Sequence, residues 1–117
     1  MFSERVMDHF QRPRNAGDLD GATAVVEVSN PVCGDVLRLA VIVENGVVRE
    51  ARFLCRGCTA AIASGSALTE ELIGRGAAEI NTIDAAAIAT GLGGLPPASF
   101  HAAQLAEDAA RAVAARM

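Results

Sequence analysis

The hydrophobic pattern changes its period at Cys58, and this change limits the folds that the chain can adopt. Before Cys58, apolar and polar residues alternate along 23–29, 35–43 and 47–54, as they do in strands that bury one face. After Cys58, apolar residues recur every third or fourth position, which is typical of helices. A short amphipathic helix is also expected at 3–11. This order predicts an α+β fold: a three-stranded antiparallel sheet with an N-terminal helix and a C-terminal helical layer.

The turn between the second and third expected strands determines which residues face each other. A two-residue loop at Asn45-Gly46 would place Val41 opposite Glu50. A three-residue loop with its glycine left-handed brings more apolar residues together, so we predict this register. If the ladder continues, it places Asp35 opposite Cys55. Within the ladder, this register pairs Leu37 with Phe53, Leu39 with Ala51, and Val41 with Arg49.

The second half of the chain is expected to be helical. We predict a helix at 59–73, one or two short helices within 76–90, and a final helix from about 98 to 115. His101 falls in the first turn of this last helix, four residues before Leu105, on the side that can face the core.

Composition excludes several classes of protein. A chain of 117 residues, 51% of them hydrophobic, predicts one domain over residues 1–117 with a buried core. A net charge of −4 without Trp or Tyr argues against nucleic acid as a partner. All ten basic residues are Arg, which excludes Schiff-base chemistry on a lysine. No apolar segment is long enough to span a membrane, and the N-terminus lacks the apolar region of a signal peptide. We therefore expect a cytoplasmic protein without a membrane partner.

Four side chains of the kinds that bind metals stand at the ends of the expected elements. Cys33 and Asp35 precede the second strand, Cys58 lies between the third strand and a helix, and His101 begins the last helix. Two thiolates, a carboxylate and an imidazole provide four donors, which suits tetrahedral zinc or iron.

The residues around these thiols suggest how they are tuned. Cys58 precedes a helix and follows Arg56 by two positions, so we predict that its pKa is lowered. Gly34 and Gly57 are expected to allow unusual backbone angles beside Cys33 and Cys58.

The cysteines also fit other interpretations. Cys55 and Cys58 have the spacing of a small dithiol oxidoreductase, although a hairpin precedes them instead of the βαβ unit of that fold. Cysteines are also among the most buried residues, so a packing role is the simpler alternative for each thiol.

The chain resembles the iron–sulfur cluster assembly scaffolds of the IscU family and the N-terminal domain of NifU. The resemblance covers nearly the whole length, and its segments occur in the family's order. They are 8–17, Cys33-Gly34-Asp35-Val36, 51–58, 60–66, Leu95-Pro96-Pro97, and His101 followed by 105–109.

The resemblance implies a scaffold rather than an enzyme. Such proteins receive iron, and sulfur from a cysteine desulfurase, build a 2Fe-2S cluster and pass it to iron–sulfur acceptor proteins. Cys33, Asp35, Cys58 and His101 match the family's metal and cluster positions. Asp35 would be the labile ligand, because a carboxylate holds a cluster less firmly than a thiolate does.

The chain departs from the family's pattern at three positions. Ala102 stands where the family has a third cysteine after the histidine, and Cys55 stands where the family usually has another residue. We expect Cys55 either to supply the missing thiolate or to be a buried small residue. The lysine that follows Leu95-Pro96-Pro97 in the family is absent, which weakens the case for an Hsp70-type chaperone partner.

An alternative keeps the fold and changes the function. The four donors would hold a single zinc ion, and the protein would serve as a sulfur-transfer partner of a cysteine desulfurase.

Overall fold

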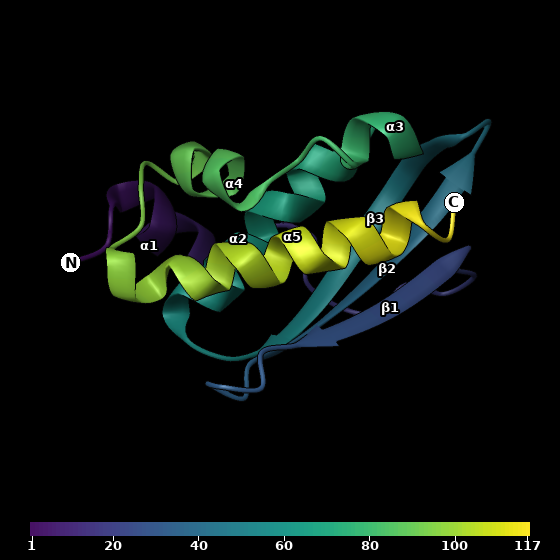
Figure 1. Ribbon diagram of the computed structural model, residues 1–117. Coiled ribbons are helices and arrows are strands. Elements are labelled where there is room, and N and C mark those ends of the chain that lie inside the picture. Colours follow the sequence, from purple (N-terminus) through teal and green to yellow (C-terminus); the bar gives the residue numbers. More distant parts are fainter.

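Three antiparallel strands form the sheet of the computed structural model, which describes residues 1–117 (Figure 1). Their order in the sheet is that of the sequence: β1 (Ala24–Ser29), β2 (Val36–Glu44) and β3 (Val47–Arg56). The helices are α1 (Glu4–Gln11), α2 (Thr59–Leu72), α3 (Ala77–Ile80), α4 (Ala85–Gly91) and α5 (Phe100–Ala114), with a 3₁₀ turn, η1 (Pro97–Ser99), before α5. The predicted α+β architecture is therefore confirmed.

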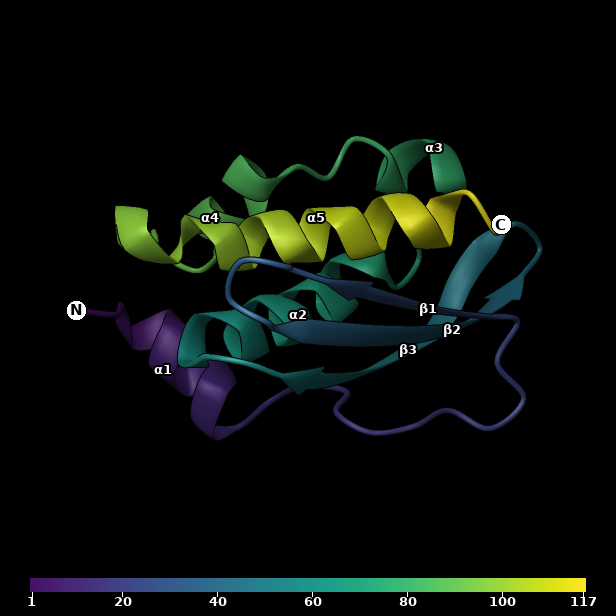
Figure 2. The ribbon, with the colours of Figure 1, turned by 60° about the horizontal axis from the view of Figure 1, so that its bottom comes forward.

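Helices α2 and α5 lie side by side on one face of the sheet (Figures 1 and 2). Helix α2 packs along β3, and α5 packs over β1 and β2. The alternating pattern explains this arrangement, because every second residue of the central strand is fully buried beneath the helices: Leu37, Leu39 and Val41. None of the helices is long and apolar enough to cross a membrane.

The β2–β3 hairpin differs from the predicted register. The turn contains only two residues, Asn45 and Gly46, both with positive φ (53° and 78°), as a tight hairpin turn of the primed type requires. A bulge beside Ile42 then adds one residue to β3. As a result, the partners of β2 move by two positions from those predicted: Leu37, Leu39 and Val41 pair with Cys55, Phe53 and Ala51. Asp35 is therefore not opposite Cys55.

The turn after α1 is fastened to α2 by a buried hydroxyl group. The Oγ of Ser66 lies 2.7 Å from Nδ1 of His9 and accepts a hydrogen bond of 2.8 Å from the amide of Arg14. Asn15 donates to Thr69 Oγ1 at 3.1 Å. These contacts fix the N-terminal segment against the helix whose first residue follows Cys58.

A glycine allows α2 to lie close to the sheet. A Cβ at Gly65 would stand 2.8 Å from the ring of Phe53 and 3.2 Å from Leu37 Cδ1. Both neighbours are buried core side chains, and close packing of the core prevents them from moving away.

We predict that Gly65→Ala lowers the free energy of unfolding by about 1–3 kcal/mol, because the added methyl overpacks the core. Urea denaturation followed by circular dichroism measures this change. Gly91→Ala is the matched control, since a Cβ there meets nothing within 4 Å, and it should change stability by less than about 0.5 kcal/mol. Equal stability of Gly65→Ala and wild type would contradict the close packing of α2.

Candidate metal centre

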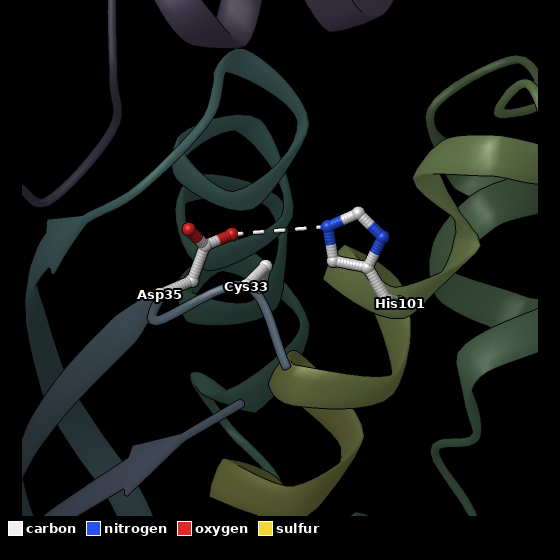
Figure 3. Close-up of side chains that lie close together, drawn as sticks. All are labelled: Cys33, Asp35 and His101. Atoms are coloured by element: carbon white, nitrogen blue, oxygen red, sulfur yellow. Dashed lines mark ion pairs between the residues drawn. The ribbon is translucent and has the colours of Figure 1, made fainter. Parts of the chain in front are cut away.

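Three segments that are distant in sequence meet at one end of the sheet: the β1–β2 loop, the β3–α2 junction and the start of α5. The ligand atoms of Cys33, Asp35 and His101 all lie within 4.8 Å of one another. Cys58 reaches the same group, because its Sγ lies 3.5 Å from Asp35 Oδ2. Figure 3 shows Asp35 and His101 pointing toward each other, with Cys33 on the loop beside them. The fold thus brings together the four side chains predicted as metal donors.

The β1–β2 loop is closed on itself by Asn30. The Asn30 side chain accepts a hydrogen bond of 2.9 Å from the amide of Val32, and its backbone bonds Gly34 at 2.8 Å and Asp35 at 2.9 Å. Gly34 has φ +77°, so the predicted unusual backbone angle beside Cys33 is confirmed. Sequence reasoning did not identify Asn30 as part of the site. Its signal was an asparagine at the start of a turn, where the side chain commonly bonds the backbone two residues later.

The carboxyl group of Asp35 is buried against the backbone of Gly57. Asp35 is 7% exposed, and a Cβ at Gly57 would lie 2.8 Å from its Cγ. Gly57 does not have a positive φ, so the predicted unusual backbone angle at Gly57 is wrong. A glycine is needed there because any side chain would collide with the carboxyl group.

His101 presents one ring nitrogen to Asp35 and anchors the other. Its Nδ1 lies 3.1 Å from the carbonyl oxygen of Ala98 in η1, and its Nε2 lies 3.8 Å from Asp35 Oδ2. An imidazole whose Nδ1–H donates to a backbone carbonyl is held with its Nε2 lone pair available, the usual arrangement of a metal-binding histidine. Ala98 was not predicted as part of the site, because a backbone carbonyl leaves no signal in side-chain identity.

The predicted lowering of the Cys58 pKa is wrong. Partial desolvation of the sulfur raises the pKa of this thiol, although the residue as a whole is exposed. The nearby Asp35 carboxylate raises the pKa further, while the amides of Ala61 and Ala60 at the start of α2 offset part of the shift. Arg56 is exposed, and its charge is screened by water. The Cys58 thiol is therefore protonated at neutral pH and donates to Asp35, and a metal ion must displace its proton.

Cys55 lies on the inner face of β3. Its thiol is half-buried, and burial raises its pKa to about 11, with smaller contributions from Asp35 and Cys58. Its side chain packs against both the main core and a small cluster of alanines, Ala60, Ala61 and Ala102.

We predict that Asp35→Asn lowers the pKa of both Cys58 and Cys55, because it removes the negative charge that disfavours each thiolate. Alkylation by iodoacetamide at pH 8 should therefore be faster at both thiols. Trypsin cleaves after Arg56 and places Cys55 and Cys58 on separate peptides, so mass spectrometry measures each rate.

Glu44→Gln is the control for this substitution, since it removes an exposed carboxylate from the hairpin end of the sheet. It should leave both alkylation rates unchanged. Unchanged rates in Asp35→Asn would show that the carboxylate does not act on the thiols.

Known proteins share both the sequence and the fold. The family model of the NifU-like N-terminal domain matches residues 1–116. The iron–sulfur cluster assembly scaffold protein IscU of Azotobacter vinelandii is 44% identical over 115 residues, covering 95% of this chain and 89% of that protein. The protein of the same name from Escherichia coli (strain K12) is 42% identical over 118 residues, covering 97% of this chain and 91% of that protein.

A solved structure shares the arrangement of the elements. The N-terminal part of a nitrogen-fixing NifU-like protein from Brucella abortus superimposes with a TM-score of 0.66 at 21% identity. The match covers 97% of this chain and 81% of that one. At this identity the likeness concerns the fold alone.

Proposed function

Because the chain belongs to the family of NifU-like N-terminal domains, we propose that it is a scaffold on which iron and sulfide are assembled into a 2Fe-2S cluster for transfer to acceptor proteins. The observation that carries the proposal is the convergence of Cys33, Asp35 and His101 within 4.8 Å, with Cys58 in contact with Asp35. A cluster shared by two iron ions requires several donors on one side of the protein, and these four come from three separate segments.

The composition of the donor set suits temporary binding. Two thiolates and an imidazole hold iron firmly, while the carboxylate of Asp35 is a hard, exchangeable ligand. Cys33 and Cys58 are exposed residues, so an incoming persulfide and an acceptor protein can approach the site from solvent. Exchange at Asp35 would then open the iron to a ligand from the acceptor.

The proposed role needs partners rather than catalytic residues. Sulfur would arrive as persulfide from a cysteine desulfurase, a thiol or other two-electron donor would reduce it to sulfide, and the finished cluster would leave to iron–sulfur acceptor proteins. The chain's own part is to bind, orient and release. The relatives named as iron–sulfur cluster assembly scaffold proteins support this role.

A second candidate is binding of a single zinc ion by the same four residues. The compact grouping of three donors favours it, because atoms within 4.8 Å of one another can all reach one tetrahedral ion with small side-chain adjustments. The protein would then assist a desulfurase without building a cluster.

We predict that anaerobic reconstitution with iron, cysteine, a cysteine desulfurase and a dithiol reductant loads iron and acid-labile sulfide in equal amounts. Cys33→Ala and Cys58→Ala should each lose most of both, because each removes one of the two exposed thiolates. Glu44→Gln should load like wild type. Zinc without sulfide in the wild type would favour the second candidate, and full clusters in both cysteine variants would contradict the scaffold site.

A further inference from the structure

Cys55 carries a thiol of the kind that binds metals and lies beside the site, but the proposed function does not use it. We propose that Cys55 is an alternative ligand that replaces Asp35 when the bound metal ion is soft. The coordination shell then consists of Cys33, Cys55, Cys58 and His101. The inference concerns the same site as the proposed scaffold function and rests on the assignment of Cys33, Cys58 and His101 as its ligands.

The strand register places Cys55 next to Asp35. Cys55 pairs with Leu37, and continuing the same ladder sets Asp35 opposite Gly57. Asp35 and Leu37 therefore share the inner face of the sheet with Cys55 and Gly57. Cys55 is the diagonal neighbour of Asp35 across the strand pair, a position where side chains about 7 Å apart at Cβ come within reach of each other.

The packing of Cys55 places its side chain on the face of the sheet that the helices cover, not on the outer face. Cys55 contacts the cluster formed by Ala60, Ala61 and Ala102, which come from the start of α2 and the start of α5. Cys58 precedes Ala60 by two residues, and His101 precedes Ala102. The sulfur of Cys55 thus lies among the backbone segments that carry the other ligands.

Electrostatic coupling supports the same placement. The charge of the Asp35 carboxylate disfavours the Cys55 thiolate, and a Cys58 thiolate would do the same once ionised, so both groups lie near Cys55. A cation bound among these groups would favour the thiolate instead, and the thiol proton would pass to solvent as the metal–sulfur bond forms.

The number of donors exceeds what one tetrahedral ion needs. With Cys55 the site offers three sulfurs, one nitrogen and one carboxylate, and a tetrahedral ion takes four ligands. A soft ion prefers thiolate to carboxylate, so the three-sulfur set is favoured over the set that includes Asp35. Metal softness would therefore select which of Cys55 and Asp35 binds.

Cobalt(II) tests this inference, because its thiolate charge-transfer absorption in the near ultraviolet grows with the number of bound sulfurs. We predict that Cys55→Ser lowers this absorption per bound cobalt by about one third and weakens binding about tenfold or more. Cys33→Ser is the reference for the loss of one sulfur. Asp35→Asn should keep the full absorption, because the carboxylate is not among the bound ligands.

Cys55→Ala serves as a second variant, since its smaller side chain suits the half-buried position, and circular dichroism verifies that each variant is folded. Undiminished absorption and affinity in folded Cys55→Ser and Cys55→Ala, with a loss in Cys33→Ser, would overturn the role of Cys55 and leave the scaffold site intact. A wild-type protein that binds cobalt with no thiolate absorption would instead contradict the ligand assignment on which both proposals depend.

Discussion

The contact of the Asp35 carboxyl group with the bare backbone of Gly57 is the constraint on which the site depends. It exists because a two-residue turn and a bulge together set the β2–β3 register. With the carboxyl group held there, a thiol from the start of α2 and an imidazole from the start of α5 both approach the same oxygen, at 3.5 Å and 3.8 Å. Any other register would move Asp35 away from these two partners.

The remainder of the fold holds these partners in place. The sheet and the two helices that cover it form two packed layers, and the donors lie where strands end and helices begin. Loops at the ends of rigid elements commonly carry function, because the scaffold fixes their positions while solvent and partners still reach them. Exposed thiols above a buried carboxylate suit a site that receives a cargo and releases it.

Sequence reasoning predicted the elements and the four donors because both depend on local patterns: hydrophobic period, and residue type at element ends. The register was predicted incorrectly, since a shift by two residues keeps every side chain on the same face and leaves the apolar pattern unchanged. The predicted lowering of the Cys58 pKa was wrong for a related reason. Spacing shows the helix start beside the thiol, but neither the partial desolvation of the sulfur nor the carboxylate brought to it from another strand.

Metal affinity of Gly57→Ala tests most directly whether the carboxylate position makes the site. The added methyl would displace the Asp35 carboxyl group while every donor residue remains present. We predict that ferrous iron affinity, measured anaerobically by titration calorimetry, falls about tenfold or more in this variant, because iron keeps the Asp35 carboxylate that a softer ion would exchange for Cys55. It should stay at the wild-type value in Gly91→Ala, with both proteins folded. Wild-type affinity for ferrous iron in folded Gly57→Ala would contradict the dependence of the site on the position of Asp35.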